Sequence, residues 1–343
     1  MKRLSSLLVL MVACSFSFAT VRTVCNMPYS PGQYTDFNSA MADSNSGDTI
    51  YVHGTSTDYG IVTINKSLVV IGTGHNPDKQ NPLVSKFLQI TISSSDVQLI
   101  GLRVNTIYSI SQSNVVIKKC RIMGSSSVIS IVADFSNDWL IEGNIIESTN
   151  VSSLFFGAQP SPGTIVQNNV FLGQTEMIGG LINLSTDRTY FFNNVFLGLS
   201  GSYNTFFDVH FAEIDNNIFY YSMPNGIMFT DNFMDNNISF GSMDNSFYAP
   251  GSNNLITDPM FENYPGFSVL FDYSWDLSLD PSSLGHNHGT DATDVGVFGG
   301  IGSKFTETGE PSIAEITAFS ITSPTTIAPG GTLTISVTSK RVP

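Results

Sequence analysis

Ile165-Val-Gln-Asn-Asn169-Val-Phe171 and Tyr190-Phe-Phe-Asn-Asn194-Val-Phe196 are two copies of one short pattern, in which a pair of asparagines interrupts a run of β-branched and aromatic residues. Three further copies place an asparagine at the equivalent position, at Asn144, Asn217 and Asn237. The steps between consecutive copies are 25, 25, 23 and 20 residues. A repeat of variable length indicates a solenoid whose successive coils carry loops of different size.

The residues around the asparagine pairs favour short strands. They are mainly β-branched and aromatic, with Gly, Ser and Asn between the runs, and no stretch of 10 residues inside the repeats has helical spacing. A coil of short parallel strands places each strand about 4.8 Å from its equivalent in the next coil. Equivalent residues of successive coils therefore stack in rows along the solenoid.

Two of these rows have clear structural roles. An asparagine tolerates the unusual backbone angles of a bend between strands, and a stack of buried amides can satisfy its own hydrogen bonds. The aromatic residue two positions after each final asparagine predicts a second row, in the core. We expect an amide ladder of Asn144, Asn169, Asn194, Asn217 and Asn237 and an aromatic stack of Phe171, Phe196 and Phe219.

The ladder, the aromatic stack and the variable period resemble the right-handed parallel β-helix superfamily of secreted bacterial proteins, the pectate-lyase-like solenoids. Residues 34–41, followed by Ser46-Gly-Asp-Thr-Ile-Tyr-Val52, resemble the opening of such proteins, and residues 291–300 resemble their closing segment. The resemblance implies an all-β fold, a right-handed parallel β-helix with a short N-terminal capping helix. We place this domain at residues 20–300.

The last residues of the chain change in character. Residues 301–343 are predicted to form a C-terminal β-strand extension, with strands over 316–323 and 332–339 around Pro329-Gly-Gly331. This pattern indicates a β-hairpin, or an edge that packs on the end of the solenoid.

Residues 1–19 have the pattern of a cleaved secretory signal peptide. Lys2 and Arg3 precede an apolar run, and Ser17-Phe-Ala19 supplies small residues before a cut after position 19. The run is shorter than the roughly 20 apolar residues of a membrane span, and no later segment is long enough to cross a bilayer. We therefore expect a secreted or cell-surface protein without a transmembrane segment. A lipoprotein signal ending at Cys14 is the alternative.

Charge and cysteine content exclude two further possibilities. The chain carries 14 Lys and Arg against 28 Asp and Glu, a formal net charge of -14. A protein that neutralises nucleic-acid phosphates needs the opposite balance, so no nucleic-acid partner is expected. Cys25 and Cys120 fall about three coils apart, roughly 14 Å, which is beyond the reach of a disulfide.

Known enzymes of the resembled superfamily act on polysaccharides, which implies two mechanisms to weigh. A lyase acting on uronic acids needs cations at the substrate, yet Arg188 is the only Lys or Arg between Arg121 and Lys304. A hydrolase needs two carboxylates, and Asp215 and Asp235 hold equivalent places in adjacent coils. The catalytic candidates are Asp208, His210, Glu213, Asp215, Asp235 and Arg188.

Three other groups of residues give weaker evidence for a functional site. Gly285-His-Asn-His-Gly289 is interpreted as a loop. Carboxylates crowd where Asp231 lies near Asp235 and where Asp291 lies near Asp294. Calcium prefers six to eight oxygen ligands, more than either pair supplies, so no metal site and no cofactor is assigned and Ca²⁺ stays open.

One residue after each ladder asparagine, a third row indicates a contact surface. If the phenylalanine row points inward, strand alternation turns this row outward. An exposed β-branched stripe would mark a binding surface, unless a long loop covers it. The binding candidates are Val170, Val195, Ile218 and Ile238, flanked by Tyr220, Tyr221 and Tyr248.

These observations favour a non-catalytic, secreted or cell-surface β-helix protein that binds a glycan or a protein partner. The alternative is a polysaccharide-degrading enzyme, a glycoside hydrolase rather than a lyase. The pattern leaves the oligomeric state open.

Overall fold

The computed structural model describes most of the chain, in twelve ranges: residues 19–28, 31–79, 82–124, 128–148, 152–174, 176–184, 188–266, 268, 270–300, 305–312, 314–321 and 332–341. Apart from Ala19, the predicted signal peptide lies outside these residues, and so does the alternative lipid site at Cys14. Within the described ranges, no helix has the length and apolar character needed to cross a membrane.

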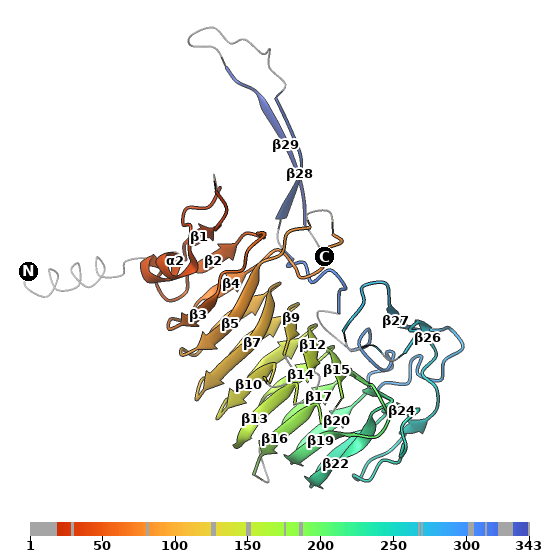
Figure 1. Cartoon of the computed structure of the whole chain (residues 1–343). Helices are drawn as coiled ribbons and strands as arrows, with labels where there is room; N and C mark the ends of the chain where they lie inside the picture. Colours follow the sequence, from red (N-terminus) through yellow and green to blue (C-terminus); the bar gives the residue numbers. More distant parts are fainter. Residues whose placement is uncertain are drawn as a thin grey trace, which may run out of the picture.

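The chain winds into parallel coils whose strands stack from one coil to the next (Figure 1). The first face is a 10-stranded sheet in which every pairing is parallel. Its strands are β1 (Val21–Val24), β2 (Thr49–Val52), β4 (Val69–Ile71), β6 (Gln98–Ile100), β8 (Val116–Lys118), β11 (Leu140–Glu142), β14 (Ile165–Gln167), β17 (Thr189–Phe192), β20 (Ala212–Asp215) and β23 (Phe233–Asp235).

A 15-stranded sheet forms the other two faces. Its long strand β7 (Arg103–Ile110) pairs with one face through its start and with the other through its end. The second face contains β9 (Arg121–Met123), β12 (Ile145–Ser148), β15 (Val170–Gly173), β18 (Val195–Gly198), β21 (Ile218–Tyr220), β24 (Ile238–Phe240) and β25 (Leu255–Ile256). The third face contains β3 (Ile61–Ile64), β5 (Lys86–Ile92), β10 (Ile131–Asp134), β13 (Leu154–Gln159), β16 (Ile178–Ile182), β19 (Asn204–His210) and β22 (Met223–Thr230). The predicted all-β parallel β-helix is confirmed.

The predicted capping helix covers the N-terminal end of the coils. Helix α2 (Phe37–Asp43) begins after Asp36, whose carboxylate accepts a hydrogen bond from the backbone N–H of Ser39 at 2.9 Å. Phe37 and Ala40 are the buried residues of this helix. The Phe37 and Phe87 rings pack edge to face, with 5.4 Å between their centroids. The helix therefore closes the apolar core of the first coils.

The asparagine ladder connects the first and second faces at their shared bend. From Asn169 onward, each ladder Oδ1 accepts hydrogen bonds from the backbone N–H and the Nδ2 of the preceding ladder asparagine. Each ladder Nδ2 also donates to a backbone carbonyl of the previous coil. Thus Asn194 Oδ1 accepts both bonds from Asn169 at 3.0 Å, and its Nδ2 donates to Val166 O at 2.8 Å. The five predicted members are 0% exposed, and Asn254 adds a sixth.

The stack of aromatic rings is confirmed beside the ladder. Phe171 and Phe196 stack at 5.0 Å between centroids, and Phe196 and Phe219 at 5.1 Å. Cys120 occupies the ladder position of an earlier coil, where its N–H donates to Asn144 Oδ1 at 2.8 Å. Cys120 and Cys25 are both buried and free, so the prediction that they form no disulfide is confirmed.

The unusual backbone angle of the bend lies one residue earlier than predicted. Asn168, Asn193, Asn216 and Asn236, which precede the ladder asparagines, have φ values of 52°, 54°, 61° and 54°. Asparagine adopts this left-handed region more readily than most residues. The two asparagines of each pair therefore divide the work: the first makes the bend and the second forms the ladder.

The parallel coils end at β25, earlier than the predicted boundary at residue 300. The described residues between 257 and 310, here named the return segment, run back along the second face (Figure 1). They contain the antiparallel pair β26 (Phe261–Asn263) and β27 (Asp276–Leu279). Their apolar residues pack on the outer side of the second face and make a second core; from the return segment these are Phe271, Trp275, Leu277, Leu279, Val295, Val297 and Phe305.

Polar contacts fasten the return segment at two places. The first asparagine of each pair, here named a bend asparagine, points its side chain outward and holds the second half of the segment. Asn168 Nδ2 donates to Val297 O and Gly299 O at 2.9 and 2.7 Å. Asn236 Nδ2 donates to His288 O at 2.5 Å. Asn193 and Asn216 make similar contacts with Asp294 and Thr290.

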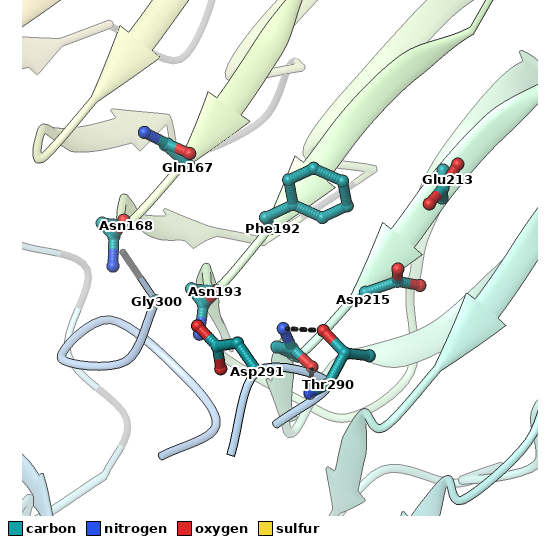
Figure 2. A pocket seen from close by; sticks show the side chains of 10 residues that line it. Gln167, Asn168, Phe192, Asn193, Glu213, Asp215, Thr290, Asp291 and Gly300 are labelled. Carbon is teal, nitrogen blue, oxygen red and sulfur yellow. Dashed lines mark hydrogen bonds between the residues drawn. The ribbon is translucent and has the colours of Figure 1, made fainter. Parts of the chain in front are cut away.

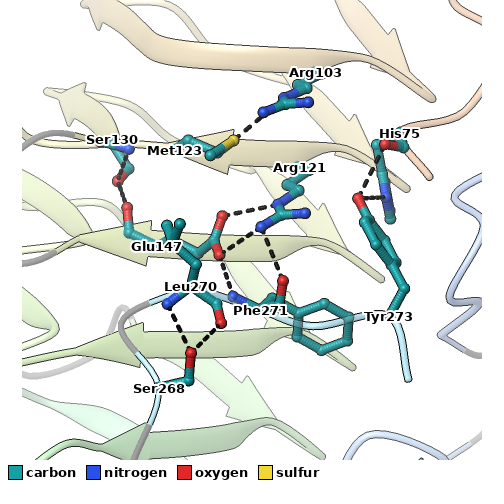
Figure 3. A network of polar contacts seen from close by, with 11 residues as sticks. His75, Arg103, Arg121, Met123, Ser130, Glu147, Ser268, Leu270, Phe271 and Tyr273 are labelled. Carbon is teal, nitrogen blue, oxygen red and sulfur yellow. Dashed lines mark hydrogen bonds and ion pairs between the residues drawn. The ribbon is translucent and has the colours of Figure 1, made fainter. Parts of the chain in front are cut away.

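The first half is held by a buried ion pair, shown in Figure 3. Arg121 contacts the Glu147 carboxylate through Nε and one terminal nitrogen, both at 2.9 Å. The same pair binds the backbone of Phe271, whose carbonyl accepts from Arg121 at 3.1 Å and whose N–H donates to Glu147 at 2.5 Å. Tyr273 lies under the guanidinium, 5.0 Å from ring centroid to Cζ, and its hydroxyl donates to His75 O at 2.9 Å.

The last described strands form the predicted β-hairpin. β28 (Ala314–Ile321) and β29 (Ile335–Arg341) pair antiparallel. The hairpin projects away from the coils beside the N-terminal end of the solenoid, rather than packing on its last coil (Figure 1).

We predict that Asn194→Leu lowers the free energy of unfolding by about 1–3 kcal/mol, because the amide groups of Asn169 and the carbonyl of Val166 lose buried partners. Urea denaturation followed by circular dichroism measures the change. Asn105→Leu is the control, since Asn105 is exposed on β7. Equal stability of the two variants would contradict the role of the ladder.

Candidate functional site

A cleft of about 460 Å³ opens where the first face meets the return segment. The floor comes from the ends of β14, β17 and β20 and from the bends that follow them, and the return segment supplies one wall (Figure 2). Its lining residues are Gln167, Asn168, Phe192, Asn193, Glu213, Asp215, Asn216, Thr290, Asp291 and Gly300.

Strand alternation explains the floor of the cleft. Gln167, Phe192 and Asp215 lie in register on β14, β17 and β20, and their neighbours Val166, Phe191 and Ile214 point into the core. The Phe192 ring is partly exposed and lies 5.5 Å from the Tyr190 ring, centroid to centroid. The floor thus combines an aromatic surface with an amide and a carboxyl group.

Asp215 is the most perturbed acid of the cleft. The residue is 8% exposed, and burial raises its pKa to about 7. The hydrogen bond that its Oδ1 accepts from Asp235 N at 3.1 Å acts in the opposite direction and lowers the pKa. The negative charges of Glu213 and Asp235 raise the pKa further. Glu213 lies two residues earlier on the same strand, and Figure 2 shows both carboxyl groups on the cleft side.

Asp235 lies in register with Asp215 on the next coil, as the repeat predicts, but it is not part of the lining. Its Oδ1 accepts hydrogen bonds from the N–H and hydroxyl of Ser252 at 2.5 and 2.8 Å. The acid that shares the cleft with Asp215 is therefore Glu213. Asp235 closes the turn that caps the last coil.

The remaining catalytic candidates lie on the other side of the bend between β19 and β20. Asp208 and His210 are at the end of β19 on the third face, with Asp208 Oδ1 and His210 Nε2 3.0 Å apart. Arg188 donates to the carbonyls of Ala212 and Asp231 at 3.2 and 3.4 Å. Its guanidinium lies 4.6 Å from the centroid of the Phe233 ring. The six candidates thus divide among three places, and only Glu213 and Asp215 line the cleft.

Of the carboxylates considered for calcium, those of Asp291 and Asp294 have protein partners. Asp291 Oδ1 accepts from the N–H and hydroxyl of Thr293 at 3.1 and 2.7 Å, and Asp294 lies 2.9 Å from His286 Nδ1. The hydrogen bond from Asp294 raises the pKa of His286. No group of three or more His, Cys, Asp or Glu gathers within the described ranges.

The predicted exposed stripe is covered. Val170, Val195, Ile218 and Ile238 do face outward from the second face, but each is 0% exposed because the return segment packs over them. The expectation that this row is an open binding surface is therefore wrong, and the alternative of a covering segment is what the structure shows. The apolar residues at 271–279, which include a tryptophan, were the signal in the sequence for such a cover.

The flanking tyrosines are also largely occupied. Tyr220 packs against Phe261 and Tyr264, with 5.5 and 5.4 Å between centroids, and Tyr221 contacts Phe240. Tyr248 is exposed, and its hydroxyl bonds the Asp244 carboxylate at 2.5 Å.

An open apolar row exists on the third face instead. Strand register aligns it across six coils, with Gly179 between the third and fourth side chains, and its apolar members are Tyr108, Val132, Phe155, Phe207 and Ile227. Phe207 and Ile227 are 38% and 50% exposed. The sequence argument missed this row because the repeat is irregular there, with bulges in β13 and β19 that disturb simple alternation.

No protein-family model matches the chain, and no curated protein matches it. Among solved structures, it is similar to the pectate lyase Pel9A, with TM-score 0.46 and 11% identity over 82% of this chain and 96% of that one. It is also similar to the pectin methylesterase from Aspergillus niger in deglycosylated form, with TM-score 0.38 and 13% identity over 68% and 85%. Likeness of this degree assigns no activity. The stacked coils themselves confirm a pectate-lyase-like parallel β-helix.

We predict that stability falls as pH rises through the window set by Asp215. Between its ordinary pKa of 3.8 and the folded value of about 7, the folded protein holds a proton that the unfolded chain has released. The free energy of unfolding therefore decreases across that window. Asp215→Asn removes this term, so its melting temperature should exceed that of the parent at pH 8 and fall less steeply from pH 5.

Thermal denaturation between pH 4 and pH 8 tests this, with Glu262→Gln as the control because Glu262 is an exposed acid. Parallel pH curves for the parent and Asp215→Asn would show that Asp215 titrates normally.

Proposed function

We propose that this protein is a secreted or cell-surface polysaccharide-binding β-helix, and that its cleft holds neutral sugar units. The observation that carries the proposal is the partly exposed Phe192 ring on the floor of a 460 Å³ cleft, bordered by Gln167, Glu213 and Asp215. A sugar ring presents C–H groups to an aromatic face and hydroxyls to amide and carboxyl groups, so this combination suits it. Pockets of this size hold small ligands or a few ring units.

Charge supports a neutral glycan over an acidic one. Three of the residues that line the cleft are acids, Glu213, Asp215 and Asp291, and none of its described lining residues is a Lys, Arg or His. The whole chain adds a formal net charge of -14. A polyuronate would meet repulsion both at long range and in the cleft. The return segment covers the apolar row of the second face, so that row no longer supports a protein partner.

We predict that Phe192→Ala weakens binding to its neutral polysaccharide about tenfold or more, because the stacking surface is lost while the hydrogen-bonding groups remain. A glycan array identifies the ligand, and affinity electrophoresis compares the variants. Tyr248→Ala is the matched control, an exposed ring far along the chain from the cleft. Binding to pectate or alginate in preference to neutral glycans, or an unchanged affinity of Phe192→Ala, would contradict the proposal.

Hydrolysis of the bound glycan is a second candidate, carried by the raised pKa of Asp215. A carboxyl group that keeps its proton near pH 7 can act as the general acid, and Glu213 supplies the second carboxylate. Alternate residues of a strand are about 6.6 Å apart, close to the separation of about 6.5–9.5 Å found in inverting glycosidases.

If hydrolysis occurs, we expect Asp215→Asn and Glu213→Gln each to lower the rate at least a hundredfold without weakening binding in proportion. A reducing-sugar assay on the neutral glycan measures it, and Glu262→Gln serves as the control because Glu262 is an exposed acid that does not line the cleft. Activity that survives both cleft substitutions would place the chemistry elsewhere. Unsaturated products from uronate polymers would indicate a lyase, which the cation-poor cleft argues against.

A further inference from the structure

A chain of three polar side chains lies on the third face, outside the cleft. His210 on β19 bridges two partners: its Nε2 lies 3.0 Å from Asp208 Oδ1, and its Nδ1 lies 2.5 Å from Thr230 Oγ1. Thr230 ends β22 in the next coil, in register with His210. The side chains of Asp208 and His210 are about one-fifth exposed, and Thr230 is exposed, so the hydroxyl end faces solvent.

The proton positions in this chain follow from its partners. An ionised carboxylate only accepts hydrogen bonds, so the proton of the neutral His210 ring is on Nε2 and points to Asp208. Nδ1 is then the acceptor, and the Thr230 hydroxyl donates to it. This is the order of carboxylate, imidazole and hydroxyl that activates a nucleophile in acyl-transfer enzymes, which is recognised by geometry rather than by fold.

A backbone irregularity that recurs at equivalent positions of four stacked strands brings these side chains together. Residues at equivalent places in β13, β16, β19 and β22 have positive φ: Ala158 at 57°, Gly180 at 67°, Asp208 at 55° and Met228 at 53°. In a regular strand Asp208 and His210 would share a face at a spacing of about 6.6 Å. The left-handed turn at Asp208 kinks β19 and brings its carboxylate to the imidazole. Such conformations in non-glycine residues are held at a cost, and they concentrate at functional sites.

We propose that Asp208, His210 and Thr230 form an acyl-transfer site that hydrolyses carboxylic esters. Thr230 Oγ1 attacks the ester carbonyl while its proton passes to His210 Nδ1. The C–O bond to the alcohol then breaks, and His210 returns the proton to the departing alcohol, which leaves an acyl ester on Thr230. Water, deprotonated by His210, releases the carboxylic acid and restores the hydroxyl. Asp208 is a positioning residue, which holds the ring and stabilises its charged form.

The surroundings indicate the class of ester. Phe207 and Ile227, the most exposed pair of the open apolar row, lie on the same two strands as the three side chains and in register with each other. An apolar acyl or aryl group can rest on them while its carbonyl reaches Thr230. Arg188 donates to the carbonyl of Asp231, the residue after Thr230, and so helps to fix the backbone at the end of β22. The site is separate from the cleft, so a test of ester hydrolysis does not depend on whether the cleft binds a glycan.

The experiment uses the full mature chain with p-nitrophenyl acetate and p-nitrophenyl butyrate as probes. We expect release of p-nitrophenol with faster turnover of the butyrate ester, and, after acid quenching, an acyl group on the peptide that contains Thr230 in mass spectrometry. Thr230→Val, which keeps the side-chain shape, and His210→Gln should each lower the rate at least tenfold. Thr230→Ser should retain activity and carry the acyl group on the introduced serine.

Two controls separate this site from ordinary surface reactivity. His288→Gln removes a histidine on the return segment, whose ring Nε2 lies 2.7 Å from the Asn253 carbonyl oxygen, and it should leave the rate unchanged. Asp208→Asn should slow turnover, because asparagine keeps the left-handed backbone but loses the charge, and Asp208→Glu should restore part of the rate. An undiminished rate in Thr230→Val with a parental melting temperature, or an acyl group found only on other residues, overturns the proposal.

Discussion

The buried amide ladder is the interaction on which the rest of the molecule depends. Each ladder asparagine satisfies backbone groups that the sharp bend between the first and second faces leaves without strand partners. Without those bonds, a bend in every coil would bury several unpaired N–H and C=O groups, each costing about 1–3 kcal/mol. In the coils from Asn144 to Asn254 the ladder also requires a constant rise, which matches the in-register strands and lets the aromatic rings stack.

The same bends organise the outside of the protein. The first asparagine of each pair adopts the left-handed conformation, and its side chain points outward to the return segment. The repeated bend asparagines of the coils therefore hold the non-repeating return segment in place. That segment covers the apolar second face and builds one wall of the cleft on the first face. The scaffold and the candidate binding site share a single structural cause.

Acids at equivalent positions of the repeat differ in their burial and in their contacts. Asp215 and Asp235 are equivalent in the repeat, yet the return segment and neighbouring coils enclose Asp215, while Asp235 bonds Ser252 at the last coil. On the third face, a kink of the backbone rather than enclosure brings Asp208 to His210. The two groups of polar residues are therefore separate in space and differ in the physics that shapes them.

The sequence by itself determined the coils, the ladder, the aromatic stack, the capping helix and the C-terminal hairpin. Each of these follows from a local pattern or from a spacing that repeats, and neighbouring coils impose the same environment on equivalent residues. It also placed Asp215 and Glu213 near each other, since alternation along one strand is enough for that. Only the tertiary structure decided which outward rows are open. The return segment lies far along the chain from Val170 and Val195, and burial of apolar area depends on contacts that no local pattern contains. For the same reason Thr230 joined Asp208 and His210 only in space, because register between β19 and β22 depends on the loop and bulge between them.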